Sequence, residues 1–107
     1  MSTIVLSARG DVALVGELRR LLPSTPVAAI RDALASAEPL IERDLYGNDH
    51  DEAAAQLLGV VDVLQRFGAS VVVEAIDGEE RSVETVEYLR AIIERHVEIR
   101  RQREGRP

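Results

Sequence analysis

The chain has no cysteine, no tryptophan and no lysine, and only three of its 107 residues are aromatic. The absence of cysteine excludes disulfides, thiol nucleophiles and zinc–thiolate sites. Long apolar runs are also missing, and the run Ile4-Val5-Leu6 is much shorter than a signal-sequence core or a membrane span. We therefore expect a cytoplasmic protein that makes no contact with membranes.

Arginine supplies all 13 basic residues, and alanine and valine are abundant, a composition typical of GC-rich bacterial genomes. The formal net charge is −6, but the charges are unevenly distributed. Residues 1–93 hold 16 acids and 8 arginines, whereas residues 94–107 hold 3 acids and 5 arginines. An acidic body repels phosphate groups, and the basic tail has no aromatic side chain on which a base can stack. Nucleic acid is therefore not expected as a partner.

The apolar periodicity predicts an α+β domain over residues 1–78 and a helical segment over residues 79–107. Strand patterns cover residues 3–8, 40–46 and 70–76, and amphipathic helix patterns cover residues 11–22, 24–37 and 49–67. The expected architecture has two layers: a three-stranded antiparallel sheet with helices on one face, in the order strand, helix, helix, strand, helix, strand. A long C-terminal helix, capped by Ser82 and extending to residue 104, ends in an arginine-rich tail.

Short sequence signals mark the ends of these elements. Asp11 is suited to cap the first helix, and Gly68 suits the left-handed position that ends the third. Asp49 and Glu52 have the spacing of a capping box at the start of the third helix. Asp77-Gly78 is a strong turn pair, so we expect the last strand to end there.

Three local runs carry a resemblance to a known family. The first strand is followed by Val12-Ala13-Leu14-Val15 and Leu18-Arg19, the second helix contains Arg31-Asp32-Ala33-Leu34-Ala35-Ser36-Ala37, and the third helix leads into the run Phe67-Gly68-Ala69-Ser70-Val71-Val72-Val73-Glu74. In these runs, and in the order of its elements, the chain resembles the C-terminal domain of the bacterial ribosomal stalk protein. The resemblance implies a diverged relative that binds another protein and catalyses no reaction.

The resemblance also suggests where such a partner would bind. In stalk proteins a basic face on the first two helices engages translational GTPases, and the matching positions in this chain are Asp11, Gly16, Arg19 and Arg31. Only the two arginines keep the positive charge, so the resemblance does not imply a ribosomal role. The substrate adaptor of the Clp protease shares the architecture, but its Asn-Asp pair for an amino terminus is replaced by Arg9-Gly10-Asp11. An adaptor of that kind is not expected.

The residues that we expect to bind a protein form two sets. The first is on the first two helices and consists of Arg19, Arg20 and Arg31; the second is an apolar stripe on the last helix and consists of Val86, Leu89, Ile93 and Val97. If the stripe packs on the domain, it belongs to the core. If it projects, it is able to join a second copy of the chain into a dimer.

A small acidic immunity or inhibitor protein is the alternative hypothesis. Such a protein would neutralise a basic toxin or nuclease through exposed carboxylates, because opposite charges steer and hold the two partners. The acids that this hypothesis assigns to the contact are Asp44, Asp49, Asp51, Glu52, Glu79 and Glu80.

Catalysis, cofactors and metals are not expected. The chain has two histidines, His50 and His96, and it has no phosphate-binding loop, paired-glycine nucleotide turn or zinc-protease motif. The run Asp49-His50-Asp51-Glu52 offers metal ligands, but the favourable effect of acids on the first turn of a helix already accounts for it.

Overall fold

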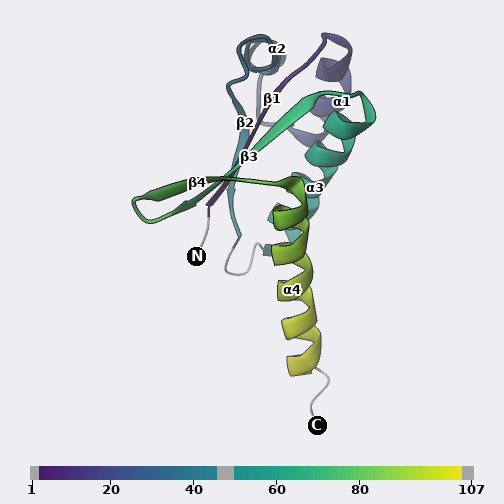
Figure 1. The fold of residues 1–107 in the computed structure, drawn as a ribbon. Helices are drawn as coiled ribbons and strands as arrows, with labels where there is room; N and C mark the ends of the chain where they lie inside the picture. The colour runs from purple at the N-terminus through teal and green to yellow at the C-terminus, as the bar shows by residue number, and fades with distance from the viewer. Residues whose placement is uncertain (1–2, 46–49, 105–107) are drawn as a thin grey trace.

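The computed structural model of the protein describes residues 3–45 and 50–104, with side chains up to residue 95. The elements are β1 (Thr3–Arg9), α1 (Ala13–Leu21), α2 (Val27–Ser36), β2 (Pro39–Asp44), α3 (His50–Arg66), β3 (Ser70–Asp77), β4 (Glu80–Glu84) and α4 (Val86–Glu104). The first six elements follow the predicted order (Figure 1). The α+β class predicted from the sequence is therefore confirmed.

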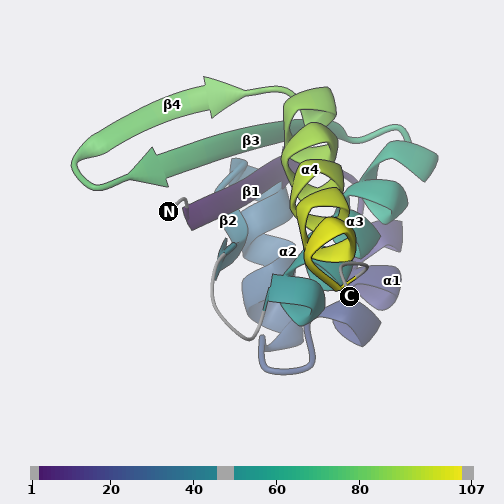
Figure 2. The ribbon, with the colours of Figure 1, turned by 90° about the horizontal axis from the view of Figure 1, so that it is seen from below.

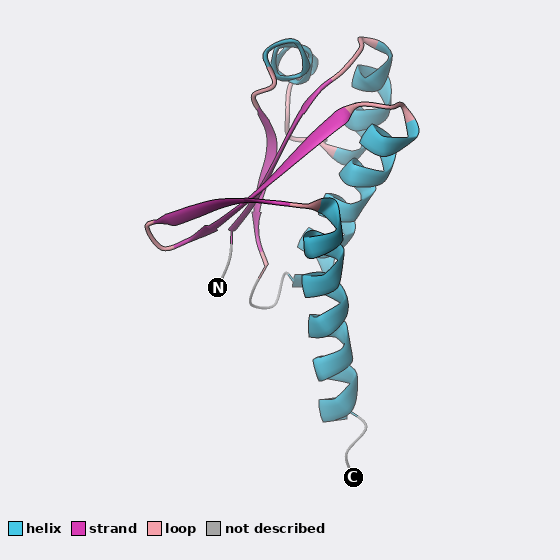
Figure 3. Ribbon diagram, in the orientation of Figure 1, coloured by secondary structure: helices cyan, strands magenta, loops and turns pink. Residues whose placement is uncertain are grey.

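The strands form one antiparallel sheet in the order β2-β1-β3-β4. Helices α1, α2 and α3 lie against one side of this sheet, and α4 begins beside β3 on the same side (Figures 1 and 2). The sheet is twisted, and the β3–β4 hairpin reaches beyond the helices (Figure 3). The predicted two-layer arrangement, with helices on one face of the sheet, therefore describes how α1, α2 and α3 lie on the sheet.

The predicted three-stranded sheet is wrong by one strand. Residues that were expected to start the last helix form β4, which pairs with β3 from Asp77↔Glu80 to Val73↔Glu84. Gly78 has φ 65° in the two-residue turn, so Asp77-Gly78 begins a hairpin instead of ending the sheet. As a result, α4 starts at Val86, and the boundary between residues 78 and 79 falls inside a turn.

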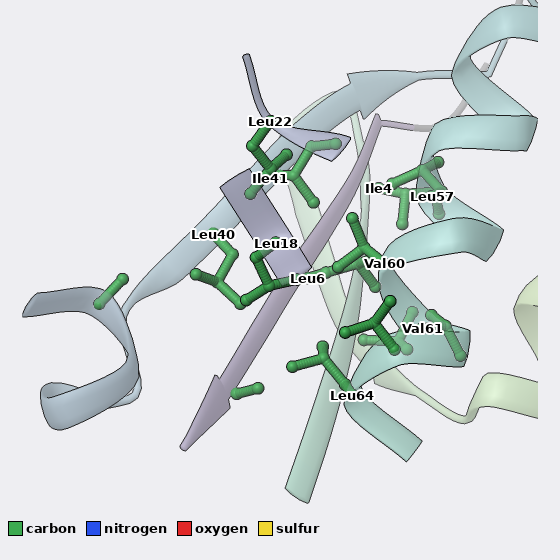
Figure 4. Packing of buried hydrophobic residues seen from close by; sticks show 14 of the residues in the cluster. Ile4, Leu6, Leu18, Leu22, Leu40, Ile41, Leu57, Val60, Val61 and Leu64 are labelled. Carbon is green, nitrogen blue, oxygen red and sulfur yellow. The ribbon is translucent and has the colours of Figure 1, made fainter. Parts of the chain in front are cut away.

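A single hydrophobic core fills the space between the sheet and the helices. Leu57, Val60 and Leu64 of α3 point toward Ile4 and Leu6 of β1 (Figure 4), and all five side chains are fully buried. These residues recur every three or four positions on the helix and every second position on the strand. The two periodicities therefore account for how α3 is placed on the centre of the sheet.

An irregularity in β2 widens this core. Leu6 pairs with Ile41 and Ser7 pairs with Pro39, so Leu40 is an extra residue on β2. Such a bulge breaks the strict alternation of a strand. Both Leu40 and Ile41 are buried in the core cluster for this reason.

The helix ends agree in part with the sequence signals. Gly68 has φ 73°, and the N–H of Ala69 donates to the Leu64 carbonyl at 2.9 Å, so the predicted left-handed end of α3 is confirmed. The Asp11 carboxylate accepts a hydrogen bond from the Val12 N–H at 2.6 Å, but Val12 is the N-cap of α1 and no side chain caps the helix, so the predicted cap at Asp11 is wrong. The predicted capping box at Asp49 lies outside the described residues.

The first part of α4 packs on the domain. Leu89 and Ile93 are buried in the core, and Val86 packs against the same core while remaining partly exposed. The Arg90 guanidinium contacts the Asp62 carboxylate of α3 at 2.8 Å. Beyond these residues α4 continues away from the sheet (Figure 1).

Candidate functional site

One side of the sheet carries no helix in the part of the chain that the structure describes (Figures 2 and 3). We call this side the open face. Paired residues of neighbouring strands point to the same side of a sheet, so the strand register defines its members. They are Thr3, Val5, Ser7 and Arg9 of β1, Glu42 and Asp44 of β2, Ser70, Val72, Glu74 and Ile76 of β3, and Arg81 and Val83 of β4.

The strand sequences explain why these side chains share a side. Along β1, Ile4 and Leu6 point to the helices, so Val5 and Ser7 between them point the other way. Val5 pairs with Glu74, which in turn pairs with Val83. The open face is therefore a regular extension of the register that builds the core.

Apolar side chains cross the middle of the open face. Val5 is only 5 % exposed because its strand is central, whereas Val72 is 40 % exposed and Val83, on the edge strand, is 73 % exposed. Ile76 is half-buried. This strip joins the three strands β1, β3 and β4, and it offers a partner a β-branched surface.

Carboxylates flank the apolar strip. The open face contains three carboxylates, those of Glu42, Asp44 and Glu74, and two arginines, Arg81 and Arg9, the second at the end of β1. The Arg81 Nε atom is 3.3 Å from the Glu74 Oε2 atom, and the Asp44 carboxylate accepts a hydrogen bond from the Thr3 hydroxyl. Carboxylates thus outnumber arginines on this face by one, and Arg81 already contacts Glu74.

The predicted arginines do not share one site. Arg19, Arg20 and Arg31 are all exposed on α1 and α2. Arg20 borders a cavity of about 700 Å³ beside β2 and α3, whereas Arg31 borders a hollow of about 70 Å³ at the start of α1. The basic face implied by the stalk resemblance is therefore divided between two ends of α1.

Hydrogen bonds of Gln56 join three elements along one wall of the larger cavity. The Gln56 side-chain amide of α3 donates to the Leu21 carbonyl at 2.8 Å and accepts a hydrogen bond from the Arg43 guanidinium. Arginines and glutamates both line the cavity, including Arg20 and Glu52. Its charges favour neither an anion nor a cation, and Gln56 is used to join α1, β2 and α3.

The apolar stripe predicted on the last helix is mostly core. Leu89 and Ile93 are buried within the chain, so neither is free to contact a partner, and Val86 lies partly exposed at the edge of the core. Val97 has no described side chain. Of the two interpretations of this helix, packing on the domain is therefore the one that describes its residues before Glu94.

The acids of the alternative hypothesis are spread over the molecule. Asp44 is on the open face, Glu79 and Glu80 are at the β3–β4 turn, and Asp51 and Glu52 are on the first turn of α3. Asp49 lies outside the described residues. Sequence reasoning included only Asp44 of the three carboxylates that the open face brings together.

No group of three or more metal-ligating side chains occurs among the described residues. His50 is 3 % exposed at the start of α3, with its Nδ1 atom 3.7 Å from the Asp51 carboxylate. None of the helices within residues 3–45 and 50–104 has the length and hydrophobicity of a membrane span.

Comparison of the chain with models of protein families, with curated proteins and with solved structures finds no match. The resemblance to the C-terminal domain of the ribosomal stalk protein therefore rests on the sequence runs and the order of elements alone, and these comparisons do not bear on it.

Proposed function

We propose that the protein is a non-enzymatic protein-binding module that holds a basic segment of another protein on the open face. One observation carries this proposal: no described helix covers that face, although it presents β-branched side chains bordered by charged ones, among which carboxylates are in excess. Apolar surface on a soluble domain that is bordered by polar groups is typical of an interaction site.

Arginine and lysine side chains match the chemistry of this face. Their aliphatic stems cover apolar surface while their charged ends reach for water or carboxylates. A stem lying over Val72 and Val83 would bring its charged end within reach of Glu42 or Glu74. Phosphate-rich partners are less well matched, because the three acids of the face outnumber its two arginines.

This proposal keeps the protein-binding role that the stalk resemblance implies, but it places the binding surface on the open face instead of on α1 and α2. Binding through α1 and α2 has less support because Arg20 and Arg31 border separate hollows. A basic partner is also what the acidic inhibitor hypothesis requires. The open face gives that hypothesis a defined surface, in which Asp44 is joined by Glu42 and Glu74.

Affinity capture with matched variants tests the proposal. Val72→Arg places a cation in the middle of the open face, whereas Ala29→Arg adds the same charge to an exposed position on α2. We expect wild-type protein and Ala29→Arg to capture the same basic protein from the source cells, with recovery falling as salt is raised. Val72→Arg should reduce recovery about tenfold or more. Equal recovery by both variants would reject the open face as the site.

A further inference from the structure

Helix α4 carries a second stripe besides the one that is buried in the core. Ala91 and Ile92 lie three and four residues after Tyr88, and Arg95 lies four and three residues after them, which places all four along one side of the helix. Tyr88 is 40 % exposed, Ala91 and Arg95 are exposed, and Ile92 is half-buried. We call these four residues the outer stripe.

Two adjoining hollows follow the outer stripe. One, of about 410 Å³, lies between α4 and the β3–β4 hairpin and is lined by Ala75, Ser82 and Tyr88 among others. The second, of about 520 Å³, is lined by Tyr88, Ala91, Ile92, Glu94 and Arg95. Because Tyr88 borders both, the two hollows are neighbours along α4, and we call them together the trough.

The balance of charge differs between the two ends of this trough. The hairpin end is lined by Asp77, Glu80 and Arg81, and Glu87 is on the first turn of α4. The other end is lined by Glu94 and Arg95, and the sequence beyond Glu94 contains five arginines and two acids. An antiparallel second α4 would place basic residues beside acidic ones at both ends, whereas a parallel α4 would align like charges.

From this arrangement we propose that a second copy of the chain occupies the trough, so that two α4 helices pack antiparallel through their outer stripes in a twofold dimer. Arg95 lies four residues after Ala91 and Glu87 lies four residues before it. With the twofold axis near Ala91, each Arg95 lies level with Glu87 of the other copy, about 6 Å along the helix from the axis. The small Ala91 side chain permits close approach of the two helices.

The second copy also supports the part of α4 that leaves the domain. Helix α4 continues past Ile93 to Glu104, away from the sheet (Figure 1). Packing against other parts of a structure contributes most of the stability of a helix. Apart from Arg81, which borders the trough, the dimer leaves the open face accessible, because that face lies on the side of the sheet opposite to the helices (Figure 2). This inference is therefore independent of the proposed function.

Sedimentation velocity of the full chain over a range from about 1 μM to 1 mM tests the dimer. We expect a concentration-dependent dimer in wild-type protein, weakened at least about tenfold by Arg95→Glu and likewise by Glu87→Arg. An equimolar mixture of the two variants should recover the dimer, since each mixed pair regains both opposite-charge contacts. Arg31→Glu and Asp32→Arg are charge-reversal controls at exposed positions of α2, and they should dimerise like the wild type.

Three results would overturn the inference. A wild-type chain that stays monomeric up to about 1 mM has no such interface. A dimer that survives both charge reversals and also Ala91→Glu uses another surface. A mixture of the two reversed variants that stays monomeric, while far-ultraviolet circular dichroism shows both to be folded, contradicts the antiparallel arrangement.

Discussion

Replacing Gly10 by alanine should destabilise the protein, because the site has no room for a methyl group. A Cβ atom on Gly10 would clash with Cδ1 of Leu14, whereas Cδ2 of Leu34, at 3.6 Å, would be in ordinary contact with it. Leu14 is almost fully buried, so its side chain has little space to move without disturbing the junction of β1, α1 and α2. Overpacking of this kind costs about 1–3 kcal/mol of folding free energy.

The same substitution at Gly16 provides the control and should have the opposite sign. Gly16 lies inside α1, it is exposed, and a Cβ atom there would meet no atom within 4 Å. Alanine in place of glycine in an exposed helix stabilises by about 0.5–1 kcal/mol. Urea unfolding followed by circular dichroism should therefore separate the two variants by about 1.5–4 kcal/mol. If Gly10→Ala were as stable as Gly16→Ala, the packing described at this junction would be refuted.

Four further substitutions test other contacts by the same unfolding measurement. Leu89→Ala should lose about 2–5 kcal/mol because it empties a fully buried position, whereas Arg90→Ala should lose less than about 1 kcal/mol because its ion pair with Asp62 is exposed to solvent. A larger loss for Arg90 than for Leu89 would contradict the packing of α4. Gln56→Ala should lower the free energy of unfolding by about 1–3 kcal/mol, because it removes two part-buried hydrogen bonds. An unchanged free energy of unfolding would show that these bonds are not formed. Ala37→Gly should stabilise by about 0.5–1 kcal/mol, since Ala37 has φ 54° at the end of α2, and destabilisation would contradict that conformation.

The predictions from sequence succeeded where burial and periodicity coincide. Leu57, Val60 and Leu64 follow the helical period and are all fully buried, and the φ of Gly68 ends α3 at the expected place. Strand β4 was missed for the opposite reason. Its only apolar residue, Val83, is exposed, and an edge strand that buries nothing has no hydrophobic pattern to detect. Its one available signal was the hairpin turn pair at Asp77-Gly78.

The candidate site was harder to predict than the core because it depends on register between distant strands. Glu42, Glu74 and Val83 are far apart in the sequence, and only the pairing of β1 with β2 and β3, and of β3 with β4, brings them to one side. Leu89 and Ile93 were correctly recognised as a stripe. Periodicity alone does not say whether such a stripe faces the same chain or another one, and the structure shows that these two residues face the core.

Crosslinking in the source cells tests the open face most directly. A photoreactive phenylalanine derivative at Val83 would stand on the open face, where the side chain is 73 % exposed, whereas the same derivative at Ala29 would stand on the exposed side of α2. The account predicts that the Val83 position yields a discrete adduct with a basic protein and that the Ala29 position does not. An adduct formed from Ala29 and absent from Val83 would contradict it and would direct attention to the surface of α1 and α2.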